Sequence, residues 1–485
     1  MRENKCRLGK EKRKVKTYLG LDIGTTSLKA AAFDEKGNRL GLCHYEYDLN
    51  TDAKTGYIEC DPELYVTLCR KAIAELTSAV GKIDAISVDT QGETMIVTDE
   101  AGCPLYPAIV WLDNRATAEA EAVKAQFGNR LVYEVTGQPE ITAGWPACKL
   151  LWFKNHLPDV FARIRKVFLL EDWILYRLTG EFVTEPTIQS SSVYFDIRTR
   201  AWWREMLDFI GVGEEIFPRV CKSAEKIGEA DGIPVVSGAL DQIAGTIGTG
   251  AVEEGIISEM TGTIMAICAM TDEIPPYDPA SIIPCHLHAA EGKYCRLLWS
   301  GTAGMALKWF KNNFSENFSF GDLDALAEKV PAGCDGMTML PHFTGATMPK
   351  YNPEARAAFA GVTLSHTRAH FARSIMEAIA FQLRQDLEYI GAGDVREIRI
   401  TGGGATGTLW PQIKADVTGK LLRKVKESET ACLGCAILAA VGIGDAASIR
   451  EAAFRMTETA EAFSSSGVDY GEAFARFCEL ENKLI

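Results

Sequence analysis

The sequence lacks any run of 18 or more apolar residues, so we expect no transmembrane helix. It also lacks a net positive charge, because 51 Lys and Arg stand against 65 Asp and Glu, a balance of −14. That balance argues against nucleic acid or an anionic membrane as a partner, since both need a basic surface. An anionic small ligand stays open, because backbone N–H groups can bind one.

Three catalytic signatures are missing as well. There is no G-x-x-x-x-G-K-[ST] P-loop, no protein-kinase H-R-D and D-F-G pair, and no G-x-S-x-G nucleophile elbow. The sequence therefore excludes a P-loop enzyme, a protein kinase and an α/β-hydrolase.

No secretory signal is visible, so the 14 cysteines are expected to be reduced thiols of a cytoplasmic protein. Cys432 and Cys435 form a C-x-x-C motif, but no second pair has zinc-finger spacing. The Cys285–His288 segment follows Pro284 and is expected to be a surface loop. Residues 1–16 hold eight basic and two acidic side chains, which favours a poorly ordered basic extension.

The order of apolar segments predicts an α/β protein. Asp61 and Pro62 begin a helix that Gly81 ends, and an apolar stripe predicts another over Thr367–Ile390. The tail Ile449–Ile485 is expected to be mostly helical.

The opening pattern returns in the second half of the chain. Tyr18–Ala30 and Ile256–Ala269 each read as a strand, a Gly-Thr turn and a strand. Gly24 and Gly262 are 238 positions apart, which suggests a duplication. We place the boundary in the Gly/Thr stretch Gly245–Gly250 and expect domains over 17–247 and 248–485.

Both turns have residues suited to phosphate. A Gly turn exposes backbone N–H groups to an anion, and the hydroxyls of Thr25, Thr26, Ser27 and Thr263 add donors. Asp22 ends the first strand, where a carboxylate suits hydrated Mg²⁺. A plain hairpin turn is the alternative.

Two further motifs follow predicted strands. Gly402–Gly407 fits G-x-G-x-x-G, but no acidic residue lies at the ribose position, so we interpret Gly403 and Gly404 as a flat platform for adenosine. Asp241 lies at a strand-to-helix turn, where it is either a helix cap or the carboxylate that phosphoryl transfer to an alcohol requires.

These residues together resemble the FGGY carbohydrate kinases of the actin, hexokinase and Hsp70 superfamily. Two stretches match that family's signatures: Gly144-x-Pro146-x-x-Lys149-Leu150-x-Trp152-Phe153-x-Asn155-His156, and Ala357-x-Phe359-x-Gly361-Val362 followed after seven residues by His370-Phe371-x-x-Ser374-Ile375-Met376-Glu377. With the motifs above, the resemblance covers about residues 17–445.

The resemblance implies two ribonuclease-H-like domains around a deep cleft, with sugar in the first domain and Mg²⁺ and ATP against the second. It implies that Asp241 is the general base, that Asp22 organises the metal and that the Thr25–Ser27 turn holds the transferring phosphate. The nucleotide site it implies comprises Thr263, Gly304, Lys308, Gly403, Gly404 and Thr408.

The substrate is less determined. Gln91, Glu93 and Gln242 are expected sugar contacts, since Gln91-Gly-Glu-Thr resembles the Gln-Arg-Glu-Thr of glycerol kinases. Gly92 replaces that Arg, and Gly144 stands where those enzymes have a substrate-contacting Tyr, so we expect more room in the pocket. A ketopentose, as in the xylulokinases, is the first expectation. A polyol such as glycerol or erythritol, and gluconate, are alternatives.

Two other classes stay open at this stage. An NAD-dependent oxidoreductase would use Gly402–Gly407, and a non-catalytic actin-like nucleotide-binding module would lack a base such as Asp241. Homodimer formation is a further expectation, although no residue pattern in the sequence determines the oligomeric state.

Overall fold

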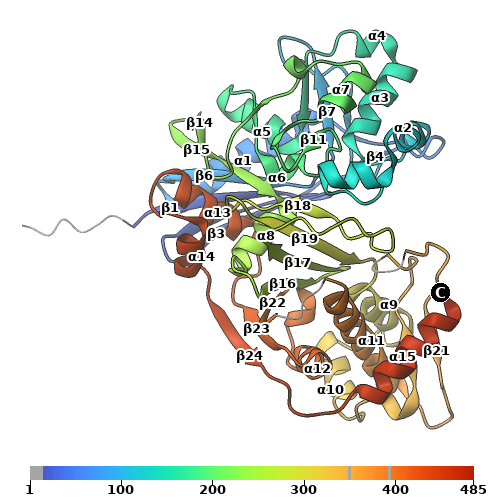
Figure 1. Ribbon diagram of the computed structural model, residues 1–485. Helices are drawn as coiled ribbons and strands as arrows, with labels where there is room; N and C mark the ends of the chain where they lie inside the picture. The colour runs from blue at the N-terminus through green and yellow to red at the C-terminus, as the bar shows by residue number, and fades with distance from the viewer. Residues whose placement is uncertain (1–14, 348–350, 391–394) are drawn as a thin grey trace, which may run out of the picture.

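The computed structural model describes residues 15–347, 351–390 and 395–485, and it has two lobes, each built on a mixed β-sheet (Figure 1). Of the expected basic extension, residues 1–14 lie outside the described residues. Within the described part of the chain, no helix is both long and apolar enough to cross a bilayer.

The main sheet of the first lobe has the strand order β14–β15–β6–β1–β2–β3. Its strands are β1 (Thr17–Ile23), β2 (Ser27–Asp34), β3 (Arg39–Glu46), β6 (Ala85–Thr90), β14 (Lys226–Ala230) and β15 (Ile233–Leu240). Strand β6 pairs in parallel with both β1 and β15. The carboxyl ends of these three strands therefore meet at one edge of the sheet.

The sheet of the second lobe repeats this order as β24–β23–β22–β16–β17–β19, with β18 added beyond β19. Its strands are β16 (Ile256–Thr261), β17 (Met265–Thr271), β18 (Cys285–Leu287), β19 (Tyr294–Ser300), β22 (Glu397–Thr401), β23 (Leu421–Val425) and β24 (Thr459–Phe463). Strand β22 lies in parallel between β16 and β23, as β6 does between β1 and β15. The matching topology supports the duplication inferred from the two turns.

Helices and smaller sheets cover these two sheets. The helices are α1 (Pro62–Val80), α2 (Thr117–Thr136), α3 (Pro146–His156), α4 (Pro158–Phe161), α5 (Leu170–Thr179), α6 (Pro186–Gln189), α7 (Arg204–Ile210), α8 (Asp241–Thr249), α9 (Gly304–Phe314), α10 (Phe320–Ala327), α11 (Arg368–Tyr389), α12 (Leu409–Thr418), α13 (Thr430–Gly442), α14 (Ile449–Met456) and α15 (Gly471–Leu484). A five-stranded sheet contains β4 (Asn50–Thr51), β5 (Ile58–Cys60), β7 (Met95–Thr98), β8 (Ala108–Ile109) and β9 (Lys166–Leu169). Three pairings complete the set: β10 (Val183–Thr184) with β13 (Arg219–Val220), β11 (Phe195–Asp196) with β12 (Ala201–Trp202), and β20 (Thr338–Leu340) with β21 (Ala358–Ala360).

Helices α8 and α13 lie between the lobes and touch backbone to backbone (Figure 1). A Cβ atom at Gly248 would lie 1.7 Å from the Thr430 carbonyl oxygen, and one at Gly434 would lie 1.9 Å from that of Ala244. Each contact therefore requires glycine. Helix α13 also covers β1 and β6 of the first lobe, although the chain reaches it only after β23 of the second.

Local sequence signals place some elements correctly and others wrongly. Helix α1 begins and ends as predicted, with the Asp61 carboxylate accepting from the Glu63 N–H at 2.9 Å. The expectation of a surface loop at Cys285–His288 is wrong, because β18 is buried and its Leu287 N–H donates to the Ser190 hydroxyl of the first lobe. The tail is mostly helical, as expected, with β24 lying between α14 and α15. The expected domain boundary at 247/248 lies within α8 and stays a prediction.

Candidate active site

Three carboxyl groups lie where β1, β6 and β15 end. Asp22 on β1 and Asp89 on β6 are partners in the parallel register, so their side chains point to the same side of the sheet. Asp241 is the first residue of α8 and directly follows β15. In α/β sheets this edge is where ligands bind.

A register shift in β15 sets the position of Asp241. Between Val236 and Ala239 the pairing with β6 is irregular, and a Cβ at Gly238 would lie 1.6 Å from the Val88 carbonyl oxygen. The Gly238 N–H donates to the buried Glu171 carboxylate at 2.9 Å. Only glycine therefore allows the strand to approach β6 and deliver Asp241 to its end.

The carboxyl cluster is poor in compensating cations. Burial raises the pKa of Asp22 to about 6, although the nearby Lys29 ammonium acts in the opposite direction. Burial, and then the Asp22 charge, raise the pKa of Asp241 to about 7. The pKa of Asp89 is raised well above its usual range, by burial and then by Asp22. A divalent cation would offset this excess of negative charge.

The predicted sugar-binding loop follows β6. Glu93 has a positive φ of 53°, and burial raises the pKa of its carboxyl group. The buried Lys149 ammonium donates to the Glu93 and Val110 carbonyl oxygens, each at 3.0 Å. Lys149 therefore fixes the strained backbone at Glu93, and burial lowers the pKa of that ammonium group. Gln91 is buried, and both polar atoms of its amide lack a hydrogen bond to any described residue.

Gly92 of this loop and Gly144, which precedes α3, do not simply enlarge the pocket. A Cβ at Gly92 would lie 3.1 Å from Leu240 and 3.2 Å from the Ser191 hydroxyl, so packed side chains already fill that direction. A Cβ at Gly144 would lie 3.1 Å from the Trp111 carbonyl oxygen. The expectation of added room therefore fails at Gly92, where neighbouring side chains occupy the space.

The first glycine turn is held by its neighbours and offers free donors. The Gly24 N–H donates to the Ser27 carbonyl at 3.0 Å, and the Tyr47 N–H to that of Thr26 at 3.0 Å. In the described parts of the chain, the N–H groups of Thr25 and Thr26 donate to no protein acceptor. The Trp111 indole donates to the Thr25 hydroxyl at 2.9 Å, which joins the turn to the loop beside Gly144.

The second turn is closed by the start of α9. The Gly304 N–H donates to the Gly262 carbonyl at 2.9 Å, and the Ala303 N–H to that of Thr263 at 3.1 Å. A Cβ at Gly304 would lie 2.3 Å from the Gly262 oxygen, so glycine is required at this contact. Thr263 is exposed, and Lys308 is exposed one turn along α9.

The glycine platform packs against the end of β16. A Cβ at Gly404 would lie 2.5 Å from the Thr261 side chain, while Gly403 is exposed. Beneath it, Lys414 of α12 donates to both carboxylate oxygens of Glu259, at 2.9 and 3.0 Å, and to the Thr261 hydroxyl at 2.7 Å. This fully buried ion pair carries no net charge and supports the platform. Thr408 is exposed at the start of α12.

The predicted residues thus form two groups linked by α8. In the first group, the charges of Asp22 and Glu93 both raise the pKa of Asp241. Thr263 with Gly304 lies at the end of β16, as do Gly403 and Gly404. Within the described residues no hydrogen bond or ion pair joins the two turns directly. Helix α8 spans between them: the Gln242 carbonyl accepts from the Cys268 thiol of β17, and the Thr246 and Ser258 hydroxyls are 3.0 Å apart.

Sequence reasoning assigned no role to Asp89 or Cys435, and gave Lys149 none beyond a signature. An acidic residue inside the otherwise buried strand Ala85–Thr90 was the one available signal for Asp89. The Cys435 thiol donates to Asp89 at 3.1 Å from 346 positions away, a contact that no local pattern encodes.

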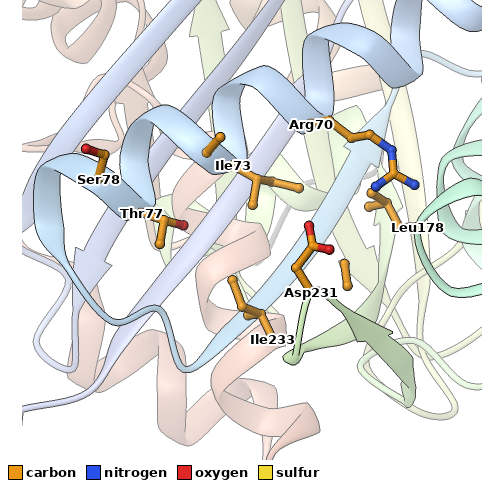
Figure 2. A pocket seen from close by; sticks show the side chains of 9 residues that line it. Arg70, Ile73, Thr77, Ser78, Leu178, Asp231 and Ile233 are labelled. Atoms are coloured by element: carbon orange, nitrogen blue, oxygen red, sulfur yellow. The ribbon is translucent and has the colours of Figure 1, made fainter.

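A separate surface groove lies far from these residues. It has a volume of about 370 Å³ and lies among α1, α5 and the turn between β14 and β15. Figure 2 shows Arg70 and Asp231 directed toward it from opposite sides. None of the predicted site residues lines this groove.

Comparison with known families gives two matches on the chain. Residues 17–248 match the N-terminal domain of the FGGY family of carbohydrate kinases, and residues 301–443 match its C-terminal domain. Together these matches cover well over half of the sequence.

Individual relatives share the whole architecture. The chain is 29% identical to the xylulose kinase of Bacillus subtilis (strain 168), over 93% of each chain. It is 31% identical to the glycerol kinase of Burkholderia pseudomallei (strain K96243), over 88% of this chain and 89% of that one. Among solved structures, the gluconate kinase of Lactobacillus acidophilus superposes with a TM-score of 0.89 at 26% identity, over 97% of this chain and 98% of the other.

Proposed function

Because the chain belongs to the FGGY family of carbohydrate kinases, we propose that it transfers the terminal phosphoryl group of ATP to a hydroxyl of a neutral ketopentose, with Asp241 as the general base. The observation that carries the proposal is the Asp241 carboxyl group at the start of α8. Its pKa of about 7 suits a base that works near neutral pH, because proton transfer is most efficient when the two match.

Asp241 acts by accepting the proton of the attacking hydroxyl as the new O–P bond forms. Phosphoryl transfer has a loose transition state, so the protein contributes mainly position and charge. The free N–H groups of Thr25 and Thr26 are suited to the oxygens of the transferring phosphoryl group, and the exposed Thr263 turn to the remaining phosphates.

Asp22 would hold Mg²⁺, with Asp89 behind it. The described residues contain no ready group of three or more His, Cys, Asp or Glu ligands, which fits an ion that keeps several waters and binds through one or two carboxylates and the phosphates. The raised pKa of the Asp89 carboxyl group beside Asp22 and the unpaired Asp89 Oδ1 atom support a cation here. When bound, Mg²⁺ would neutralise part of the phosphate charge.

The charges around the predicted sugar loop favour a neutral substrate. Glu93 and Asp241 interact electrostatically, so two carboxyl groups border the same space. The nearby cations are already committed: Lys149 binds two carbonyls, and the fully buried Arg115 side chain is paired with Asp113 and Glu59. An aldonate carboxylate would therefore meet repulsion without a partner.

A polyol such as glycerol or erythritol is the second candidate. The Gln91-Gly92-Glu93-Thr94 loop supports it, together with the 31% identity to a glycerol kinase. A side chain at position 92, such as the arginine of the glycerol kinase motif, would have to displace Leu240 and Ser191, which favours the ketopentose.

The test is a coupled ATP-to-ADP assay over xylulose, ribulose, glycerol, erythritol and gluconate. We expect a ketopentose to give the highest kcat/KM, and gluconate a value at least about tenfold lower, equal to 1.4 kcal/mol of transition-state binding. Fastest turnover of gluconate would refute the neutral-substrate proposal. Failure of all five to turn over would refute the ketopentose and polyol assignments together.

Three further predictions accompany the function. We propose a sugar domain over 17–247 and a nucleotide domain over 248–485. The 13 described cysteines are all free, which supports a reducing cytoplasm. Homodimer formation stays a prediction that sedimentation velocity would measure.

A further inference from the structure

Helix α13 brings the second half of the chain under the catalytic edge of the first. It lies on β1 so closely that a Cβ at Gly20 would be 2.0 Å from the Cys432 carbonyl oxygen. The C-x-x-C motif lies in the first two turns of this helix, and Cys432 and Cys435 are both fully buried. With no metal-ligand group among the described residues, the motif needs another explanation.

One of the two thiols contacts a carboxyl group of the candidate site. The Cys435 Sγ atom donates to Asp89 Oδ2 at 3.1 Å, and neither residue is exposed. The other oxygen, Asp89 Oδ1, is buried without a hydrogen bond to any described residue. Asp89 lies beside Asp22 in register, so the thiol fixes the carboxyl group that faces Asp22.

A second contact from the start of α13 reaches the other neighbour of Asp22. Lys29 is the partner of Asp22 across the β1–β2 pair, and its ammonium group binds Glu429 Oε2 at 2.8 Å. Glu429 immediately precedes α13. The helix and the residue that precedes it therefore contact both neighbours of Asp22. Cys435 contacts Asp89 on β6, and Glu429 contacts Lys29 on β2.

We propose that Cys435 and Asp89 form a positioning pair that holds the Asp22 carboxylate in the orientation that binds the divalent cation. This inference rests on the proposed function of Asp22. Asp89 and Cys435 act through Asp22 rather than on the reacting atoms. The physical reason is that a carboxyl group held by a fixed donor has fewer orientations, and outer partners of this kind tune metal ligands.

The test is Mn²⁺ affinity, measured by electron paramagnetic resonance on the full-length protein with ADP. Asp89→Ala is expected to weaken Mn²⁺ binding about 10-fold or more, the usual effect of losing an outer-sphere partner. Cys435→Ala is expected to weaken it about threefold, since a thiol is a weak donor. Asp89→Asn and Cys435→Ser keep a hydrogen-bonding group and should stay within about twofold of the wild type.

Cys432→Ala is the matched control, because it removes a buried thiol from the same helix without removing a bond to Asp89. It should lower the melting temperature about as much as Cys435→Ala and leave Mn²⁺ affinity unchanged. The double variant Asp89→Ala/Cys435→Ala should bind Mn²⁺ no more weakly than Asp89→Ala, because the two residues act as one unit.

Equal Mn²⁺ affinity in Cys435→Ala and Cys432→Ala, or additive losses in the double variant, would overturn the inference. Its failure is distinguishable from failure of the proposed function. If the wild-type protein phosphorylates sugars and Asp89→Ala leaves the Mn²⁺ affinity unchanged, the positioning pair alone is refuted. A wild-type protein without turnover whose Mn²⁺ affinity follows the predicted pattern refutes the kinase assignment and supports the pair.

Discussion

The same strand ends carry different chemistry in the two lobes. Counting back from the turn glycines Gly24 and Gly262, Asp22 in the first lobe corresponds to Met260 in the second. The register partner of Asp22 is Asp89, whereas that of Met260 is Thr401. One topology thus presents paired carboxyl groups at one edge, and a thioether with a hydroxyl at the other.

The second lobe does have an acid near its edge, but it is neutralised. Glu259 is fully buried and paired with Lys414, whereas burial raises the pKa of Asp22 to about 6 despite the nearby Lys29 ammonium. Uncompensated carboxyl groups suit a cation and a general base, and a neutral edge of glycines and hydroxyls suits a nucleotide. The difference teaches that the charge at the strand ends, rather than the fold, distinguishes the proposed roles of the two lobes.

The largest expected effect comes from removing the base in the first lobe. Asp241→Asn should lower kcat by about 10²–10⁴, because the attacking hydroxyl loses its proton acceptor. The folded protein should keep most of its affinity for ATP, since most of the residues proposed to bind the nucleotide lie in the other lobe. Steady-state kinetics and ATP titration measure both, and near-normal kcat would remove Asp241 from its role.

Breaking the neutral pair of the second lobe should cost stability rather than chemistry. Lys414→Met leaves Glu259 buried and unpaired, for which we expect a loss of about 3–5 kcal/mol in the free energy of unfolding. The control is Lys426→Met, which breaks an exposed pair with Glu458 and should cost under about 1 kcal/mol. Denaturant unfolding compares the two, and equal losses would contradict the contrast between the lobes.

The junction between the lobes can be probed on one helix. Gly248→Ala places a Cβ against the Thr430 carbonyl and should destabilise the protein by about 1–3 kcal/mol. Gly245→Ala lies on the same helix with its nearest heavy atom 3.9 Å away, so helix propensity should make it neutral or stabilising. Similar melting temperatures for the two variants would argue against backbone contact there.

The smallest effect concerns pH. Because the folded-state pKa values of Asp22 and Asp241 are raised to about 6 and about 7, the folded state binds more protons than the unfolded state above pH 4. Metal-free stability should therefore fall as pH rises from about 4 to 7, by on the order of 1–2 kcal/mol after solvent screening. Asp241→Asn should flatten this slope, and Lys426→Met should leave it unchanged.

Local signals in the sequence account for what could be predicted. The ends of α1 follow from a carboxylate cap, a proline and a glycine within one segment, so neighbouring residues suffice. The family resemblance supplied the two-lobed α/β architecture, which the structure matches. Asp22 and Asp241 were predicted as site residues from their places at strand ends, and the structure brings both to the same edge of the first sheet.

Residues whose role depends on distant partners could not be predicted. The segment Cys285–His288 was expected to be a surface loop. It is instead buried as β18, and its Leu287 N–H donates to the Ser190 hydroxyl, 97 positions away. Strand β24 is largely exposed, so it has no buried apolar face that would mark it in the sequence. The Asp89–Cys435 contact depends on α13 reaching back to the first sheet, which only the tertiary fold provides.

The packing of α13, which comes late in the chain, against the first sheet has a consequence for biosynthesis. The first sheet is complete when β15 emerges from the ribosome, but α13, which covers it, follows some 190 residues later. At about 5–20 residues per second, that face waits roughly 10–40 s for its cover. During translation the nascent chain thus exposes an apolar surface around Tyr18 and Val236, where chaperones would be expected to bind.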